Sequence, residues 1–348
     1  MNQRSRPDDY EAPYPAYSAV FTADTQEYSM ALFGLQLHDT AAQTAAQAEA
    51  LRDGFVALCE RDGDGRPLHV ESGRQDCDEQ GSGNEVVIPY WRDAADQQAF
   101  WARDDVQALL DQPPPAAVGW WREAVAGRTS AVDANYSLEN VRYGIARHTE
   151  REPEQFHAYF GSMRDRVPDF LAGRADGAPG QIDVARREPA STLGQRLKIS
   201  GFPEKLCVIR GGFGWDQATP KEQEAFKDEM LPVFKAGADY LRDHREDSNC
   251  ISLRFIREHE TGLDSGVQVE VLGWFLTLAD LERWTRSHPT HLAIYQGVLK
   301  YMAKFQFEPK LNLGHEVAVV DASGIEAEYC NCHAMTGFLP FFAWQRAG

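Results

Sequence analysis

The sequence has no hydrophobic run that approaches the roughly 18–20 residues of a membrane-spanning helix. Its N-terminal stretch, MNQRSRPDDYEAPYPAYSAV, also lacks the apolar core of a secretory signal peptide. Both absences lead us to expect a protein that stays in the cytoplasm and has no membrane partner.

Positive charge is scarce relative to negative charge. The 348 residues include 35 lysines and arginines against 53 aspartates and glutamates, a formal net charge of −18. Such a surface repels nucleic acids and anionic membranes, so we expect neither as a partner. Hydrophobic residues make up 43% and charged residues 25%, which argues against disorder and indicates a chain that buries a substantial core.

Cysteine is also scarce. Its scattered positions favour free thiols over a disulfide scaffold: Cys59, Cys77, Cys207, Cys250, Cys330 and Cys332. Only Cys330, Cys332 and His333, in the stretch YCNCHAM, resemble a metal cluster. As a strand, this stretch would place the two cysteines on one face and His333 on the other. No second ligand pair lies at the spacing of a zinc site, so we interpret these residues as structural.

Motifs for nucleotide and hydrolase chemistry are missing. RGGFGW (210–215) has glycines, but it has neither the G-x-G-x-x-G spacing nor the lysine of a phosphate-binding loop. The sequence contains no G-x-S-x-G and no H-E-x-x-H. These absences argue against a dinucleotide-binding enzyme, a P-loop enzyme, a serine hydrolase and a zinc protease.

The sequence does contain alternating strand and helix patterns, preceded by an arm. The arm, residues 1–20, is rich in proline, tyrosine and charge, and we expect it to lie over the body of the protein. We expect strands over 28–37, 84–91, 205–212, 249–256, 267–276, 315–322 and 326–332. We expect helices over 41–60, 93–102, 219–244 and 278–286, followed by a helix that contains His291.

A short internal repeat points to a duplicated fold. IPYWRDAADQQAFW (88–101) aligns without gaps on LGWFLTLADLERWT (272–285). Both halves, about 21–130 and 195–348, read as β-α-β-β-α units, which is the ferredoxin-like order. We therefore predict a single α+β domain, 21–348, in which the two halves form a facing antiparallel sheet or barrel. The helices would lie outside, and a flat cofactor would lie between the halves.

Two histidines, His288 and His291, open the helix predicted in SHPTHLAIY. Pro289 suits the first helical position, which leaves His288 at or before the cap and argues against a zinc ion shared by the pair. His291 lies further in, on an apolar stripe with Tyr295 and Val298. The positive end of the helix dipole favours the neutral imidazole, the form that binds a metal. A single imidazole on an apolar face is what haem iron requires, and a packed core histidine is the ordinary alternative.

Three other residues carry charge in apolar surroundings. Asp133 and Arg166 lie in the region that joins the halves, 131–194, whose irregular stretch 174–192 has the length of a functional loop. Arg166 follows aromatic residues in YFGSMRDR, and an exposed helix arginine is its alternative role. His315 is either a partly buried strand histidine or a general acid. Asp133 is most simply a turn residue.

Five motifs occur in order along nearly the whole chain: YFGSMRDR, RLKIS followed by LCVIR, LERWTRSHPTHLAIY, GHEVAVV and YCNCHAMTGFLPFF. With them, the sequence resembles the haem-containing aldoxime dehydratases, including the phenylacetaldoxime dehydratases. The resemblance implies that His291 is the axial ligand of haem iron. It also implies that His315 is the distal acid and base, and that Arg166 positions the oxime.

Two positions depart from the family's pattern. Most relatives have serine or threonine after IR, where this sequence has Gly211, which offers no hydroxyl to the oxime. Where relatives have a glutamate, the nearest match is Asp133, one methylene shorter. We expect Gly211 in the substrate-binding site and Asp133 in the catalytic set. Both changes bear on which substrate is used.

The resemblance implies a haem-dependent lyase that dehydrates an aldoxime, R–CH=N–OH, to a nitrile. The cofactor would be haem b, ferrous in the active form, the partner a small-molecule aldoxime, and the assembly a homodimer. One alternative is a haem enzyme of the same fold that acts on another N–O or N–N substrate, which the lost hydroxyl at Gly211 favours. The other is a non-enzymatic haem sensor or carrier.

Overall fold

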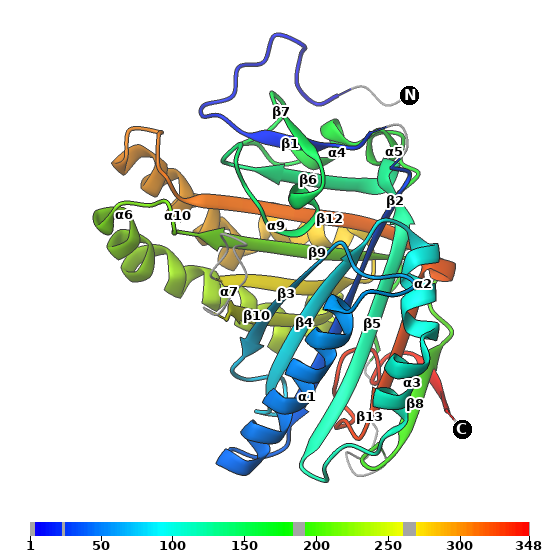
Figure 1. The fold of residues 1–348 in the computed structure, drawn as a ribbon. Coiled ribbons are helices and arrows are strands. Elements are labelled where there is room, and N and C mark those ends of the chain that lie inside the picture. Colours follow the sequence, from blue (N-terminus) through cyan, green and yellow to red (C-terminus); the bar gives the residue numbers. More distant parts are fainter. Residues whose placement is uncertain (1–3, 23–24, 184–191, 260–268, 348) are drawn as a thin grey trace.

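One antiparallel sheet runs through the described part of the chain, residues 4–22, 25–183, 192–259 and 269–347 of this computed structural model (Figure 1). Its strands are β1 (Tyr17–Val20), β2 (Glu27–Leu37), β3 (His69–Gln75), β4 (Gly83–Trp91), β5 (Val118–Arg128), β6 (Val132–Tyr136), β7 (Glu150–Pro153), β8 (Arg196–Ser200), β9 (Lys205–Gly214), β10 (Cys250–Glu258), β11 (Val269–Phe275), β12 (Asn312–Asp321), β13 (Ile325–Cys330) and β14 (Ala343–Arg346). Their order is β14-β8-β13-β5-β2-β4-β3-β10-β11-β9-β12-β6-β1-β7.

Helices cover the sheet, which confirms the predicted α+β class. They are α1 (Ala42–Glu60), α2 (Ala94–Ala102), α3 (Asp104–Asp111), α4 (Ser162–Arg166), α5 (Pro168–Leu171), α6 (Pro220–Ala225), α7 (Leu231–Asp243), α8 (Arg245–Ser248), α9 (Leu278–Ser287) and α10 (Pro289–Lys304), with short turns η1 (Thr129–Ala131), η2 (Gly144–Arg147) and η5 (Ala322–Gly324).

The helix predicted over 219–244 begins as expected but is interrupted. Thr219 caps it and forms a reciprocal capping box with Glu222. A π-helical segment, η4 (Phe226–Met230), then separates α6 from α7. Pro232 follows directly, and its ring excludes the ordinary hydrogen bond to the carbonyl four residues back. The interruption is therefore a consequence of the proline.

The two halves of the chain have the same strand order. In the first half the order across the sheet is β5-β2-β4-β3, with α1 after β2 and with α2 and α3 after β4. In the second half it is β12-β9-β11-β10, with α6 to α8 after β9 and with α9 and α10 after β11. The halves join where β3 pairs with β10.

Each half also receives a strand that follows the other half in sequence. β6 comes directly after β5 but pairs with β12, and β13 comes directly after β12 but pairs with β5. The two exchanged strands have similar sequences, VDANY (132–136) and IEAEY (325–329), and each follows a short 3-10 turn. The exchange therefore places part of the connecting region beside the last strand of the second half.

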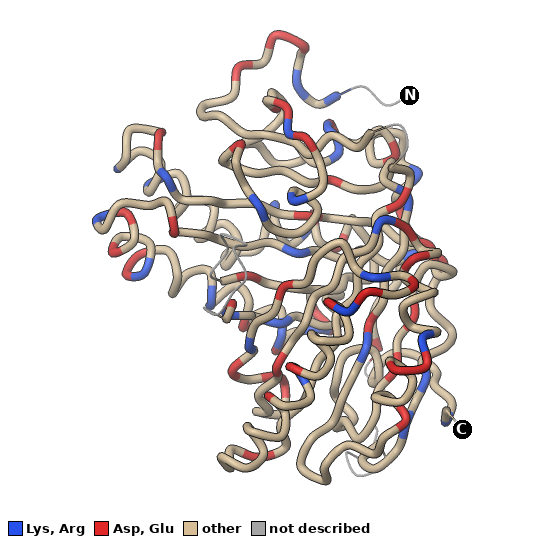
Figure 2. The backbone as a smooth tube through the Cα atoms, viewed as in Figure 1, with Lys and Arg blue, Asp and Glu red and all other residues tan. Residues whose placement is uncertain are grey.

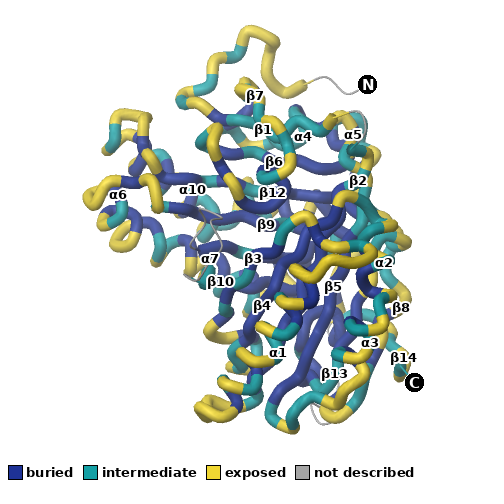
Figure 3. The backbone as a smooth tube through the Cα atoms, viewed as in Figure 1, coloured by how far each residue is buried: buried dark blue, intermediate teal, exposed yellow. Residues whose placement is uncertain are grey.

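A core of buried side chains lies between the halves, and Figure 3 shows the central strands coloured as buried. Side chains of both halves meet there, among them Tyr28 and Tyr90 of the first half and Trp274 of the second. Two buried glutamates also lie in this interior. The carboxylate of Glu316 accepts hydrogen bonds from Tyr28 and Tyr90 at 2.9 and 2.8 Å. That of Glu123 accepts one from Trp274 at 2.8 Å.

The predicted cofactor cavity between the halves is therefore wrong. His291 and His315, the residues predicted to serve the cofactor and the chemistry, line a cavity on the other, helix-covered face of the second half. Both faces of β12 are buried, because Ala318 packs into the interior core while Val317 packs under the helices.

The stretch YCNCH has a structural role in the described chain, but its predicted geometry is wrong. β13 ends at Cys330, and Asn331 adopts a left-handed conformation with φ 52°. Cys332 consequently faces the interior core, whereas Cys330 packs on the outer face of the first half. The His333 ring lies 2.9 Å from Asp78 and holds the β3–β4 loop.

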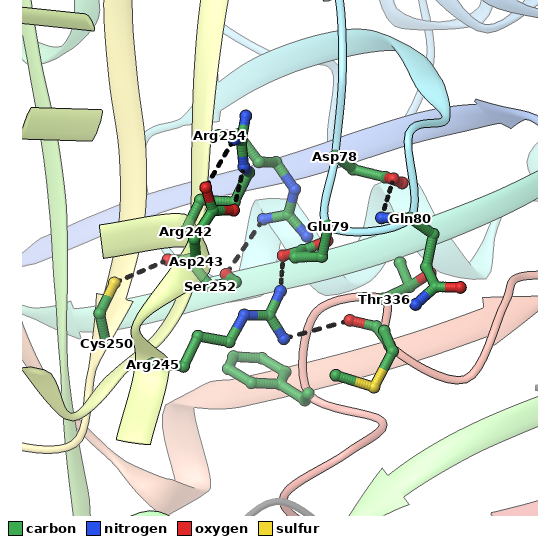
Figure 4. Close-up of polar contacts among 12 residues, drawn as sticks. Asp78, Glu79, Gln80, Arg242, Asp243, Arg245, Cys250, Ser252, Arg254 and Thr336 are labelled. Carbon is green, nitrogen blue, oxygen red and sulfur yellow. Dashed lines mark hydrogen bonds and ion pairs between the residues drawn. The ribbon is translucent and has the colours of Figure 1, made fainter. Parts of the chain in front are cut away.

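The same loop is tied to the second half by buried charge (Figure 4). Arg245 of α8 pairs with Glu79 and donates to the backbone carbonyl of Met335 at 3.1 Å. Figure 2 shows acidic and basic residues interspersed along the chain. No described helix is long and apolar enough to cross a membrane. Of the predicted loop 174–192, residues 184–191 lie outside the described residues, and residues 174–183 form no helix or strand.

Candidate active site

Helix α10 begins at Pro289, as its sequence predicts, and His288 is its cap. The Nδ1 of His288 accepts the N–H of Thr290 at 3.3 Å. The ring of His288 also stacks on Tyr240, with centroids 3.8 Å apart. The first histidine of the pair is therefore occupied by the helix start, and only His291 reaches the cavity below α10.

The His291 imidazole is neutral near pH 7. Burial lowers its pKa to about 4, an effect that the backbone of Thr285 partly offsets. Its Nδ1 is buried and makes no hydrogen bond of ordinary geometry within the described residues. The ring lies edge-on to Trp284, with centroids 4.7 Å apart. Such an imidazole is in the form that binds a metal.

On the sheet side of the same cavity, three polar side chains form one connected group. The Nε2 of His315 lies 2.9 Å from Oδ2 of Asp133. The Nε and Nη2 of Arg166 donate to the two carboxylate oxygens of Asp133 at 2.8 and 2.5 Å. The side chains of Asp133 and Arg166 are only 2% and 4% exposed, whereas that of His315 is 31% exposed. His315 and Arg166 both line the cavity, whereas Asp133 lies behind them, and His315 is the most exposed member of the group.

The charges of this group are fixed by its geometry. Burial alone would raise the pKa of Asp133, but Arg166 and His315 outweigh it and hold that pKa well below its ordinary value. Burial alone would lower the pKa of Arg166, but Asp133 outweighs it and raises that pKa. Asp133 is therefore an anion and Arg166 a cation. The carboxylate is in place to hold a proton-bearing Nε2 of His315.

The strand exchange assembles this group. In the pairing of β6 with β12, Asp133 lies opposite Val317, two residues from His315 and on the same face of the sheet. Arg166 ends α4, and its Nη1 donates to the carbonyl of Phe156 at 2.9 Å. Two residues of the connecting region thus meet one residue of the second half. Asp133 is buried in a strand, so its predicted alternative as a turn residue is wrong.

The cavity has a volume of about 280 Å³ and mostly apolar walls. Its apolar lining comes from β9, β12, α9 and α10: Ile209, Phe213, Leu281, Ile294, Val298 and Leu313. An apolar cavity with a few convergent polar groups is the usual form of a small-molecule site.

Gly211 is buried in β9, directly opposite His315 of β12. A Cβ at this position would lie 3.5 Å from the Cβ of His315, which is ordinary contact, and the φ of Gly211 is not positive. A side chain here would project on the same face as His315, because opposed residues of paired strands share a face. The predicted role of Gly211 in substrate binding stays a prediction.

Sequence reasoning missed one wall of the cavity, to which the N-terminal arm contributes Tyr14. Its ring lies 5.0 Å from that of His157, another cavity residue. Burial raises the pKa of Tyr14 to about 12, and burial together with the charge of Arg166 lowers the pKa of His157 to about 4. The backbone N–H of Ser5 donates to Asp165 at 3.0 Å, which fastens the arm beside Arg166. The tyrosines and prolines of YEAPYPAY were the available signal.

A sequence model of the haem-containing dehydratases matches residues 31–338. The chain belongs to this family. It is 31% identical over 347 residues to the aliphatic aldoxime dehydratase of Rhodococcus erythropolis, covering 97% of this chain and 93% of that protein. It is 29% identical over 282 residues, 79% of each chain, to the phenylacetaldoxime dehydratase of Bacillus sp. (strain OxB-1).

A solved structure of an aldoxime dehydratase in complex with butyraldoxime is also similar. It superimposes with a TM-score of 0.86 at 30% identity, covering 98% of this chain and 93% of that one. A second aldoxime dehydratase structure gives a TM-score of 0.84. The fold of this haem-containing dehydratase is therefore that of the aldoxime dehydratases.

The donor set of the cavity fits the family's cofactor. No group of three or more histidine, cysteine, aspartate or glutamate side chains able to hold a metal ion occurs among the described residues. His291 instead offers one neutral imidazole in an apolar wall. A porphyrin supplies four ligands of its own, so one imidazole is enough to attach haem iron to a protein.

Proposed function

We propose that this haem-containing dehydratase is a lyase that converts an aldoxime to a nitrile and water, with His291 as the axial ligand of ferrous haem b. The observation that carries the proposal is the placement of His291 and His315 on two walls of one cavity. His291 would hold the haem, whose iron would supply Lewis acidity and electron density to the C=N–O unit of the substrate.

His315 performs both proton transfers in this proposal. Its protonated imidazole donates to the oxime hydroxyl, which leaves as water when the N–O bond breaks. The neutral imidazole then accepts the hydrogen of the aldoxime carbon as the carbon–nitrogen triple bond forms. His315 donates one proton and accepts one, so it ends the cycle in the protonation state in which it began. The cycle therefore needs no other acid or base.

Arg166 and Asp133 position this chemistry. The Oδ2 atom of Asp133 lies 2.9 Å from Nε2 of His315 and 2.5 Å from Nη2 of Arg166. The imidazole and the guanidinium therefore contact the same carboxylate oxygen. The Nη2 of Arg166 lies 3.4 Å from Nε2 of His315, where it is able to orient the oxime oxygen that receives the proton. Aspartate takes the role that the family's glutamate has.

Nitrile formation by the haem-loaded protein tests the proposal. The protein is reduced with dithionite and given butyraldoxime or phenylacetaldoxime, and the nitrile is measured by gas chromatography. We expect turnover of at least one of them in the reduced protein and little in the oxidised one. The contrary result is a reduced, haem-replete protein that turns over neither compound, nor any of a panel of alkyl and aryl aldoximes. It would favour another N–O or N–N substrate, or haem sensing, as the function. The homodimer and the cytoplasmic location stay predictions.

A further inference from the structure

The helix-covered face of the first half contains a second cavity, of about 260 Å³, between α2, α3, β5 and the start of β13. We call it the first-half pocket and define it by Gln97, Trp101, Gln107, Arg122 and Glu326. The gap-free internal repeat matches some of its residues to residues that line the cavity with His291. The matches are Gln97 with Leu281, Gln98 with Glu282 and Trp101 with Thr285.

Strand register extends this equivalence into the sheet. One residue before the repeat, Val87 of β4 matches Val271 of β11. Val87 pairs with Phe33 of β2, and Val271 pairs with Gly211 of β9. Phe33 is therefore the first-half counterpart of Gly211.

The next two pairings reach the polar group itself. Phe33 pairs with Arg122 of β5, as Gly211 pairs with His315 of β12, so Arg122 is the counterpart of His315. On the exchanged strands, Glu326 is displaced by two residues from Arg122, as Asp133 is from His315. The first-half pocket therefore lies where the catalytic cavity would lie, with an arginine and a glutamate in place of the histidine and the aspartate.

Arg122 differs from Arg166 and Arg254, two other buried arginines, in its ion pairs. It is 6% exposed, and its Nη2 lies 3.5 Å from Glu326 and 3.4 Å from Glu328, both long for an ion pair. Its Nε is buried without a hydrogen-bond partner among the described residues. By contrast, Arg166 and Arg254 each hold a carboxylate at two points, at 2.5–2.9 Å. Among the described residues, Arg122 has no such two-point partner.

The surroundings of Arg122 leave a second donor unused. The carboxylate of Glu328 is held more tightly by Arg196, at 2.5 Å. The indole of Trp101 lies over the guanidinium, 4.5 Å from the ring centroid, and is 6% exposed. Its Nε1–H is buried and has no acceptor within the described residues. Two buried donors without acceptors are unfavourable unless a water or a ligand oxygen satisfies them.

We propose that the first-half pocket binds a small oxyanion, a carboxylate or a phosphate, through Arg122 and Trp101. An oxyanion offers several acceptor oxygens, and a guanidinium favours such groups because its donors match their geometry. The volume restricts the ligand to a small molecule. The site is distinct from the cavity with His291, and its existence does not depend on the aldoxime chemistry.

Calorimetric titration of the haem-loaded full chain tests this proposal. Acetate and inorganic phosphate are titrated separately at constant ionic strength set with sodium chloride, and the two titrations distinguish a carboxylate ligand from a phosphate ligand. We expect saturable binding of at least one of them. Arg122→Met should weaken it by roughly tenfold or more, and Trp101→Phe by roughly threefold to tenfold.

Glu326→Gln should strengthen anion binding, whereas the two variants above weaken it. This carboxylate is half exposed, so its replacement is tolerated, and it competes with a ligand for Arg122. Binding should strengthen severalfold. Arg92→Met, which removes an exposed arginine that pairs with Asp96 instead, is the control and should change nothing.

Two results would overturn the proposal. One is the lack of saturable binding of either anion by both the native protein and Glu326→Gln. The other is undiminished binding by Arg122→Met. If Arg122→Met does not fold, the variants Glu326→Gln and Trp101→Phe decide the question. Anion binding at a different site would not be strengthened by the first and weakened by the second.

Discussion

The two halves of this protein place different side chains at equivalent points of the same strand order. In the first half, Phe33 stacks on Phe55 with ring centroids 4.0 Å apart and fills the outer face of the sheet. In the second half, the equivalent residue is Gly211, which leaves the face beside His315 open. The comparison teaches that one sheet position is able to hold a packed aromatic ring or to leave the space beside a polar residue free, while each half keeps a cavity of similar volume under its helices.

The helices that cover the two cavities also differ between the halves, in their length. After α2, the first half has α3, with 8 residues, whereas after α9 the second half has α10, with 16 residues. Only the longer helix carries a buried imidazole toward the sheet, at His291. The two halves therefore differ at two points around their cavities, a glycine in place of a phenylalanine in the sheet and a longer helix with one histidine, whereas their strand order is the same.

The largest effect is expected from His291→Ala, which removes the metal-binding imidazole that distinguishes the second half from the first. We expect folded protein that purifies nearly without haem absorbance and has no aldoxime turnover, because the second half loses its metal-binding imidazole. The haem content is measured from the absorption spectrum against protein concentration. His288→Ala is the control, and it should keep the haem and lose at most roughly 0.5–2 kcal/mol from the helix cap. The opposite pattern, haem lost with His288 and kept with His291, would show that the two roles are reversed.

His315→Ala leaves the cofactor site and removes the proposed acid and base. We expect normal haem content and a fall in kcat of roughly 10²–10⁴, the usual contribution of a placed acid–base group. Single-turnover nitrile formation by the reduced enzyme measures it. His244→Ala, an exposed histidine outside the cavity, is the matched control with unchanged rate. Turnover of His315→Ala within threefold of native would exclude His315 from the proton transfers.

The two buried glutamates of the interior allow the halves to be compared by the free energy of unfolding that each one contributes. Glu123 follows Arg122 and Glu316 follows His315, so they occupy equivalent positions, but Glu123 faces the charge of Arg254 whereas Glu316 accepts hydrogen bonds from neutral donors such as Tyr90. Glu123→Gln leaves a buried guanidinium without its carboxylate and should cost about 3–5 kcal/mol. Glu316→Gln keeps one acceptor oxygen and should cost about 1–3 kcal/mol.

Urea unfolding of the two glutamine variants checks this difference. Both are compared with native protein at the same pH and haem content, with the free energy of unfolding extrapolated to water. Equal losses would mean that Arg254 finds another partner, and a larger loss for Glu316→Gln would contradict the comparison.

Most strands and helices were predictable, because their signals are local. The caps of α6 and α10 and the strand patterns of β2 and β9 are written in neighbouring residues. The position of the cavity was not predictable by the same means. GHEVAVV is buried on both faces of β12, one against helices and one against the other half, and a pattern buried on both faces does not say which side is open.

The catalytic group was harder to predict because it depends on the strand exchange. Nothing local in SAVDANY says that β6 pairs with β12, since pairing partners lie far away in the sequence. The similarity of VDANY to IEAEY was present in the sequence and would have revealed two equivalent strands. β3, HVESGRQ, was also missed, because it lacks the run of aromatic and β-branched residues that marks a strand.

The smallest expected effect comes from Gly211→Ser, which adds the hydroxyl that the family resemblance leads us to expect at this position. The site has room for it, because a Cβ there would lie 3.5 Å from His315 and 3.7 Å from the carbonyl of Gly314, and the φ of Gly211 is not positive. A regained hydrogen bond to the oxime is worth about 0.5–1.5 kcal/mol, so kcat/KM should hold or rise by roughly threefold to tenfold. Gly211→Ala adds the same Cβ without the hydroxyl and should show no gain. If both variants fold, keep their haem and lose activity sharply, the open space beside His315, rather than the missing hydroxyl, decides how this enzyme takes its substrate.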